Sequence, residues 1–342
     1  MDMAAQLSRF LLRRLAVSLP LVVAVVFVTF MLVRIGGGDP VALLAGPTAS
    51  VQEHAAIRSG LGLDRSLIEQ FGIYLARAVR GDLGQSWLSN KQVIDEIGNR
   101  AVVSLELLLW GVAIGAAIGI PLGARAAARR GSAFDQAVRA LSLAGFSIPT
   151  YWLGLIAILV FFYLLDLAPA PMGRLSPSLI APERITGSYL VDALLRGQWE
   201  GARSALSQLI LPVVTVAVVA CAPIMKHSRA IASEIVDSEF IRFARSCGLG
   251  ERRIRRMVLR NSLVPVLTFV GTEIVGLLGT SSLIELIFSW GGVGQWGLQS
   301  ILNGDFAAIQ GYVLFAALLS VAVFIFIDAA NFLLEPRGRE RL

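Results

Sequence analysis

The sequence predicts an all-α polytopic membrane protein with six transmembrane helices. Hydrophobic residues make up 56% of its 342 residues, and its mean hydropathy is +0.71. Several apolar stretches run for about 18 or more residues, which is the length that a helix needs to cross the hydrocarbon core. A transmembrane β-barrel would instead show short segments of alternating polarity, and the sequence contains no series of them. These observations place the protein in a membrane and predict helices as its spanning elements.

Six apolar stretches are long enough to span the bilayer as helices. Five of them contain no charged residue, and the remaining one contains Glu273 and Glu285. Within the second stretch, three glycines four residues apart, Gly111, Gly115 and Gly119, predict a close approach to a neighbouring helix. The predicted spans are residues 16–33, 107–124, 140–165, 204–225, 263–288 and 306–327.

The first predicted span follows Arg9, Arg13 and Arg14, an arrangement that also occurs in secretory signal peptides. Its apolar part is longer than the roughly 7 to 15 residues of a signal peptide. The residues after it, from Arg34 to Pro40, do not resemble a small-residue cleavage site. We therefore expect this stretch to be retained as a transmembrane helix.

Basic residues predict the orientation, because short cytoplasmic loops carry an excess of Lys and Arg. With six spans, the arginines of the N-terminal segment, of residues 125–139, of residues 226–260 and of the tail all lie on one side. Both termini are therefore expected in the cytoplasm. The chain then divides into a cytoplasmic N-terminus with the first helix (1–34), an extracytoplasmic region (35–100), a core with the other five helices (101–333) that includes a cytoplasmic loop (227–262), and a cytoplasmic tail (334–342).

The basic loop, residues 242–265, is the strongest functional signal in the chain. Nine Lys or Arg residues oppose four acids between Lys226 and Arg260. Gly248 lies between two helix-like halves, where a left-handed residue can end one helix and turn the chain. Apolar residues at i, i+3 and i+4, namely Ile254, Met257 and Val258, give the second half one apolar edge. This pattern predicts a helix that binds in a groove of a partner protein; the alternative is a loop that only sets topology.

Four function classes lack support in the sequence. The net charge of +6 is explained by orientation, so it gives no reason to expect a nucleic-acid partner. His54 and His227 fall on opposite sides of the predicted topology, so no shared metal site is expected. Neither Cys221 nor Cys247 is placed for an exported disulfide, so we expect both to be reduced. The chain has no GxxxxGK[ST] phosphate-binding motif, so we expect it to bind no ATP itself. A membrane-embedded enzyme would need paired histidines, a Ser/Lys dyad or two facing aspartates, which the predicted spans lack.

Carboxylates inside the bilayer are costly and normally face a cavity or a partner. Glu273, in the middle of the fifth predicted span, is therefore the best candidate to line a pathway or to pair with another subunit. Glu285 and Asp328 lie nearer span ends, so each is either a pathway or intersubunit residue or an interfacial one. Glu106, at a span edge, is expected to be structural.

Short motifs follow one another along nearly the whole chain in the order of a known family. The chain resembles a B-type permease subunit of the dipeptide/oligopeptide (and nickel) branch of ABC importers, and Arg242-Phe-Ala-Arg-Ser-Cys-Gly-Leu-Gly is similar to the EAA loop of that family. The segments that carry the resemblance are Leu11-Leu-Arg-Arg-Leu, Gly38-Asp-Pro, Leu61-Gly-Leu-Asp-Arg, Gly81-Asp-Leu-Gly, Ser104-Leu-Glu-Leu, Ile120-Pro-Leu-Gly, Ser147-Ile-Pro-Thr-Tyr-Trp-Leu-Gly, Leu211-Pro-Val-Val-Thr, Glu285-Leu-Ile-Phe, Gly291-Gly-Val-Gly, Gly304-Asp-Phe, Gln310-Gly and Glu335-Pro-Arg.

Some positions depart from the family pattern. Arg242 stands where the general loop motif has Glu, and Cys247 and Gly250 replace more usual residues around Gly248. Gly291 stands where Pro is common, and Gly304 and Ala307 replace a usual Arg and Pro. These departures leave the loop intact. They leave the identity of the cargo open, because residues 291–307 are expected on the outer side, where the incoming ligand or its binding protein would contact them.

The resemblance implies a type I ABC importer bundle in the bacterial inner membrane that forms half of a pathway for di- or oligopeptides. It implies four kinds of partner: a homologous second permease, two ATP-binding subunits that hold ATP and Mg²⁺, an extracytoplasmic solute-binding protein and membrane lipid. Nickel chelates or opine-like solutes are alternative cargoes, and a stand-alone channel or secondary carrier would not need the basic loop. In that loop, the resemblance assigns Ala244 and Gly248 to close packing, Leu249 to the coupling segment, and Arg242, Arg245, Arg252 and Arg253 to contacts with the ATPase.

Overall fold

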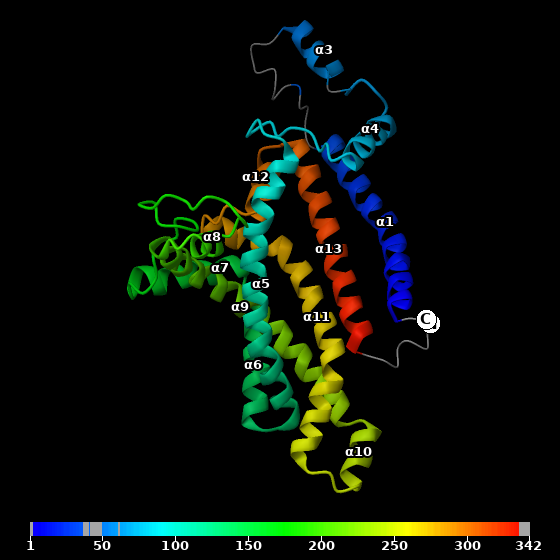
Figure 1. Cartoon of the computed structure of the whole chain (residues 1–342), viewed down its shortest axis with the longest axis vertical. Helices are drawn as coiled ribbons and strands as arrows, with labels where there is room; N and C mark the ends of the chain where they lie inside the picture. The colour runs from blue at the N-terminus through cyan, green and yellow to red at the C-terminus, as the bar shows by residue number, and fades with distance from the viewer. Residues whose placement is uncertain (1–2, 37–40, 42–49, 61, 335–342) are drawn as a thin grey trace.

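The computed structural model describes residues 3–36, 41, 50–60 and 62–334, and within these ranges the regular elements are all helices. The only β-type pairing among them is one isolated bridge between Gln85 and Gln92. In chain order the helices are α1 (Met3–Gly36), α3 (Val51–Gly60), α4 (Leu67–Val79), α5 (Val93–Ala128), α6 (Ala133–Ser147), α7 (Thr150–Ala157), the π-helix η1 (Ile158–Leu164), α8 (Tyr189–Leu195), α9 (Trp199–Val236), α10 (Glu239–Ser246), α11 (Glu251–Ile287), α12 (Val293–Leu302) and α13 (Phe306–Leu334) (Figure 1).

Five of these helices are long and apolar enough to cross a membrane, which confirms the predicted all-α polytopic fold. The long axis of the molecule follows α5, α11 and α13, with α3 and α4 at one end and α10 at the other (Figure 1). The five candidate spans in the described residues are Leu11–Gly36, Val93–Ala128, Trp199–Val236, Glu251–Ile287 and Phe306–Phe332.

The predicted span 140–165 is not one straight helix, which corrects the sequence prediction. It is divided between α6 and the segment formed by α7 and η1, and these two parts meet at an angle of 98°. Pro149 explains the break, because a proline disfavours helical backbone at the preceding residue. Ile148 accordingly takes the extended values φ −80° and ψ 126°. The count of six spans therefore holds only if the bent pair serves as one of them.

The central packing joins α5 to α9 along the predicted glycine stripe. A Cβ added to Gly115 would lie 2.8 Å from the carbonyl oxygen of Ala217, and one added to Gly123 would lie 2.5 Å from that of Met225. The two backbones thus approach more closely than side chains would permit, as the small-residue spacing predicts. Around this contact, the fully buried core contains Leu107, Leu108, Val216, Ile224 and Ile284.

At the end that carries α4, the segment before α5 is attached to the start of α13. Asp305 accepts hydrogen bonds from the hydroxyl of Ser86 (2.6 Å) and from the backbone amides of Trp87 (3.0 Å) and Leu88 (3.3 Å). Its other carboxylate oxygen accepts from the amide of Ala308 and so caps α13. One side chain therefore fixes the segment before α5 to the start of α13.

Element boundaries differ from the predicted domain limits. The helix α5 begins at Val93, inside the region 35–100, and α9 and α11 extend far into the predicted loop 227–262. Outside helices α9, α10 and α11, that loop keeps only two short connections. The motif Gly38-Asp-Pro and the tail motif Glu335-Pro-Arg lie outside the described residues.

Candidate functional site

The basic loop folds around α10, a two-turn helix with one buried and one exposed face. Ile241 and Ala244 are buried, whereas Phe240 and Phe243 are exposed, Phe243 at 72%. The buried face packs between α5, α9 and the start of α11, so α10 is held firmly against three long helices. The fully buried members of this cluster are Ala124, Ala127, Ala232, Ile241, Ala244, Ile254 and Val258.

Gly248 ends α10 in the left-handed conformation, as the sequence predicted. Its φ is +77°. The amide of Gly248 donates to the carbonyl of Arg245 (2.9 Å), and the amide of Leu249 donates to that of Ala244 (3.2 Å). These two bonds form a Schellman motif, and Leu249 supplies the apolar contact that accompanies it by packing against the buried cluster. The following residue, Gly250, is the N-cap of α11, which begins at Glu251.

The packing role expected of Gly248 is wrong within this chain. No atom lies within 4 Å of the position that its Cβ would occupy, so the backbone angle alone requires glycine here. Ala244, by contrast, is buried at 6% exposure, and its small side chain fits the contact with the neighbouring helices.

The apolar edge formed by Ile254, Met257 and Val258 faces the interior of the chain, which corrects the prediction that it binds in a groove of a partner protein. Ile254 and Val258 are 1% and 5% exposed because they pack against α10 and its neighbours. The exposed apolar surface comes instead from Phe240 and Phe243. The sequence contained the signal for these two, since they lie i and i+3 on a stripe beside that of Ile241 and Ala244, but periodicity alone does not say which stripe is covered.

The arginines of the basic loop are exposed around these two phenylalanines. Arg245 forms an ion pair with Glu251 across the turn (Nε to Oε1, 3.5 Å). In the described part of the chain, Arg242, Arg252 and Arg253 have no ion-pair partner. The end of the molecule thus carries two aromatic rings among several uncompensated guanidinium groups, a surface suited to a partner groove with apolar and acidic walls.

Glu273 and Asp328, two of the three acids predicted as pathway or intersubunit residues, differ in whether they have a partner inside the chain. Glu273 is half-buried on α11, and within the described residues no hydrogen bond or ion pair involves it. Asp328, on α13, pairs with Arg14 of α1 (Nε to Oδ2, 3.1 Å). The structure therefore gives Asp328 a partner inside the chain and leaves Glu273 without one among the described groups.

Glu285 is fully buried inside the chain, so its carboxylate does not lie on the surface where a pathway or a second subunit would contact it, unlike the expectation for a pathway or intersubunit residue. Its carboxylate accepts hydrogen bonds from the hydroxyl of Ser104 (2.5 Å) and the amide of Gln295 (2.8 Å). Ser104 in turn accepts from the amide of Val293 (2.8 Å). A Cβ on Gly292 would lie 2.5 Å from the Glu285 carboxylate, so glycine is needed for the close approach of this backbone. This network joins α5, α11 and α12.

Ser104 is far in sequence from the neighbouring motifs that contain Glu285 and Gly292, and only the fold shows that it meets them. A serine and a glutamate within otherwise apolar helices were the available signal, because buried polar groups need partners. Among the described residues, no group of three or more His, Cys, Asp or Glu side chains is placed to hold a metal ion.

Comparison with known proteins agrees with these motifs. The family described as "Binding-protein-dependent transport system inner membrane component" matches residues 119–340, and its companion "Binding-prot-dependent transport system membrane comp, N-term" matches residues 7–107.

Curated relatives match over almost the whole chain. The dipeptide transport system permease protein DppB of Escherichia coli (strain K12) is 33% identical over 337 residues, which cover 97% of this chain and 99% of that protein. The di/tripeptide transport system permease protein DppB of Pseudomonas aeruginosa (strain UCBPP-PA14) is 35% identical, with 97% and 99% covered. The probable D,D-dipeptide transport system permease protein DdpB of Escherichia coli (strain K12) is 36% identical, with 96% of each covered. The chain therefore belongs to the family of inner membrane components of binding-protein-dependent transport systems.

Proposed function

We propose that this chain is the permease subunit that forms half of the import pathway for di- or oligopeptides in an ATP-driven importer. The cargo class is supported by the names of its relatives, which are dipeptide, di/tripeptide and D,D-dipeptide permeases. Specificity then lies mainly in a separate extracytoplasmic binding protein. The other subunits are a homologous permease and two ATPase subunits, which bind the ATP and Mg²⁺. Both termini and α10 face the cytoplasm in this proposal, as the basic segments indicate.

The observation that carries the proposal is the exposed aromatic face of α10. Phe243 is 72% exposed at the end of the molecule, although the opposite face of the same helix is fully packed. An aromatic side chain surrounded by guanidinium groups is typical of a binding hot spot. We therefore assign this face to the ATPase subunit, with Phe243 as the apolar anchor and Arg242, Arg252 and Arg253 around it.

Movement of the ATPase subunits would pass into the membrane through rigid elements. The helix α11 runs without interruption from Glu251, beside α10, to Ile287, beside the buried Glu285 network. When two ATP molecules draw the ATPase subunits together, α10 moves with them and α9 and α11 act as levers. The pathway then changes between inward-open and outward-open states.

The test is the ATPase activity of the reconstituted complex, with solute-binding protein added with and without a panel of short peptides or nickel. Phe243→Ala, Gly248→Trp and Arg245→Glu should each abolish or strongly reduce stimulation by loaded binding protein, by about tenfold or more for the loss of a hot-spot anchor. Phe326→Ala is the matched control, because Phe326 is 76% exposed but lies on α13.

Two results would contradict parts of the proposal separately. If stimulation survives all three substitutions, the basic loop only sets topology. If the substitutions abolish stimulation but no peptide ever supports it, the coupling assignment stands and the cargo is another solute, such as a nickel chelate.

A further inference from the structure

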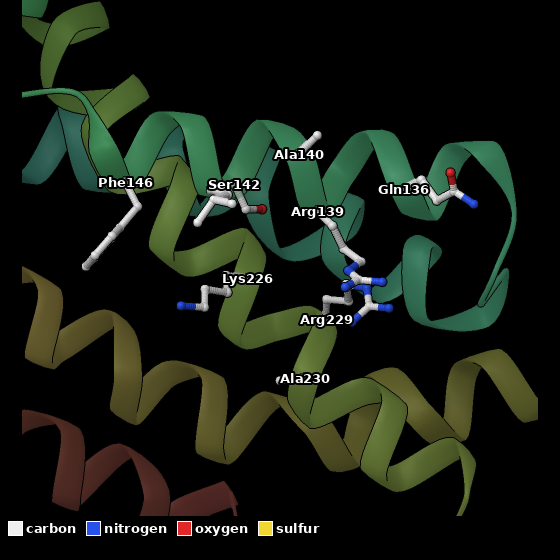
Figure 2. Close-up of a pocket in the computed structure, with 9 residues that line it drawn as sticks. Gln136, Arg139, Ala140, Ser142, Phe146, Lys226, Arg229 and Ala230 are labelled. Atoms are coloured by element: carbon white, nitrogen blue, oxygen red, sulfur yellow. The ribbon is translucent and has the colours of Figure 1, made fainter.

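A groove of about 550 Å³ lies between α6 and α9 (Figure 2). Its walls combine apolar side chains, among them Leu143 and Phe146, with cations that project from both helices. The basic side chains that line it are Arg139, Lys226 and Arg229.

One of the three cations is neutralised inside the protein, and two are not. Arg229 donates through both Nε and Nη2 to the carboxylate of Asp135, which is 2% exposed; the Nη2 bond is 2.9 Å long. Arg139 and Lys226 are exposed, and no carboxylate among the described residues pairs with either of them. The groove therefore carries about two uncompensated positive charges between two membrane helices.

Charge and apolar surface are ordered along the groove. Arg139 and Arg229 lie together at one end, where α6 begins, whereas Phe146 lies at the other (Figure 2). Phe146 is seven residues beyond Arg139, or about 10 Å along a helix that rises 1.5 Å per residue. Lys226 lies beside the apolar end, with Nζ 5.4 Å from the Phe146 ring centroid. A ligand with an anionic head and an apolar tail matches this order.

The position of the groove points to the membrane as the source of that ligand. The charged end adjoins the basic connection between α5 and α6, which the excess of arginine places at the cytoplasmic membrane surface. Leu143 and Phe146 are both 66% exposed, so their side chains are available to hydrocarbon. A soluble anion would gain nothing from these two side chains, whereas an acyl chain would bury them.

We propose that the groove binds an anionic phospholipid of the cytoplasmic leaflet, with the headgroup phosphate at Arg139, the flexible Lys226 side chain turning toward it from the apolar end, and an acyl chain against Leu143 and Phe146. Basic pockets between transmembrane helices on the cytoplasmic side are suited to anionic headgroups. The long stems of Arg139 and Lys226 let their charges reach the interface while their carbons cover apolar surface. Arg229, held by Asp135, contributes a fixed hydrogen-bond donor beside Arg139.

The first test is lipid retention by the whole complex in nanodiscs of phosphatidylcholine with phosphatidylglycerol, measured by native mass spectrometry after detergent release. Arg139→Ala with Lys226→Ala should weaken phosphatidylglycerol binding about thirtyfold, at about 1 kcal/mol per basic side chain and 1.4 kcal/mol per tenfold. Arg139→Lys with Lys226→Arg should retain the lipid. The charge-matched control Arg9→Ala with Arg125→Ala removes two exposed arginines elsewhere and should also retain it. Equal retention by the alanine pair and this control would overturn the proposal.

The second test identifies what covers the groove. A photo-cross-linking amino acid in place of Leu143 should give an adduct with the mass of a phospholipid in the intact complex. An adduct with the homologous permease instead would overturn the proposal and assign the groove to a protein interface.

Discussion

Gly248 is required by its backbone angle, and a nearby glycine provides a matched comparison. Its φ of +77° is one that residues with a Cβ adopt at a cost, whereas Gly250 has φ −66° and equally open surroundings. We predict that Gly248→Ala destabilises the turn by about 1 kcal/mol, while Gly250→Ala has a smaller effect, which comes only from the preference of the α11 N-cap for Gly over Ala. Gly248→Asn should be milder than Gly248→Ala, since asparagine tolerates the left-handed region. Hydrogen exchange of the α10 amides measures the effect, and equal exchange in the two alanine variants would contradict it.

The contact between Ser104 and Glu285 should show strong energetic coupling. Both side chains are buried, and removing either one leaves a buried polar group without its partner, at a cost of about 1–3 kcal/mol. We expect Ser104→Ala and Glu285→Gln each to lower the midpoint of thermal unfolding, and the double variant to lose less than the sum of the two. Glu273→Gln is the control, because Glu273 has no hydrogen-bond partner among the described residues. Additive losses would mean that the two groups do not act together.

The residue scale also shows what the sequence alone leaves undetermined. The glycine turn at Gly248 was predictable because few residues adopt a positive φ. Glu285 was not placed correctly, because hydropathy shows that a carboxylate falls near the end of a span but not that Ser104, far away in sequence, approaches it. Phe243 was overlooked because its i, i+3 spacing from Phe240 does not say which face of the helix is covered.

At the scale of elements, the loop before α9 is organised by one carboxylate. Asp192 of α8 accepts hydrogen bonds from the amide and hydroxyl of Thr186 (both 2.7 Å) and from the amide of Gly187 (3.0 Å). Burial alone would raise the pKa of Asp192, but these hydrogen bonds outweigh it and hold the pKa below the usual value for an aspartate.

The lowered pKa of Asp192 predicts how the stability of this loop depends on pH. A carboxylate whose pKa is lowered in the folded state stabilises that state above its unfolded pKa of about 3.9, and this contribution is lost as the pH falls through the folded pKa. Limited proteolysis between residues 183 and 198 should therefore accelerate below about pH 4. In the Asp192→Asn variant, proteolysis of this loop should be faster at neutral pH, and its rate should no longer rise as the pH falls. An unchanged acid profile in the variant would show that another group controls the loop.

The helices themselves were the most predictable elements, since each long uncharged stretch needs to satisfy its backbone hydrogen bonds inside the membrane. The broken span between α6 and α7 was missed because hydropathy measures composition and not direction. Pro149 was the available signal, as it restricts the residue before it. The inward-facing edge of Ile254 and Val258 was misassigned for a related reason: amphipathic spacing predicts that one face is covered but not by what.

At the scale of the whole molecule, one helix links α10 to the far end of the bundle. The helix α11 has 37 residues, or about 55 Å at 1.5 Å per residue. Its first turn packs against α10, and its last turn contains Glu285, which holds α5 and α12. A displacement of α10 would therefore reach the opposite end of the bundle through continuous helical backbone rather than through loops.

The central claim is that the exposed face of α10 binds the ATPase subunit, and site-directed photo-cross-linking tests it most directly. A photo-reactive amino acid would replace Phe243 in the complete complex, and the same amino acid in place of Phe326 would serve as the control, since both positions are largely exposed. The account predicts a covalent product between position 243 and the ATPase subunit, and none from position 326. A complex that assembles and hydrolyses ATP, but gives no such product from position 243, would contradict the account.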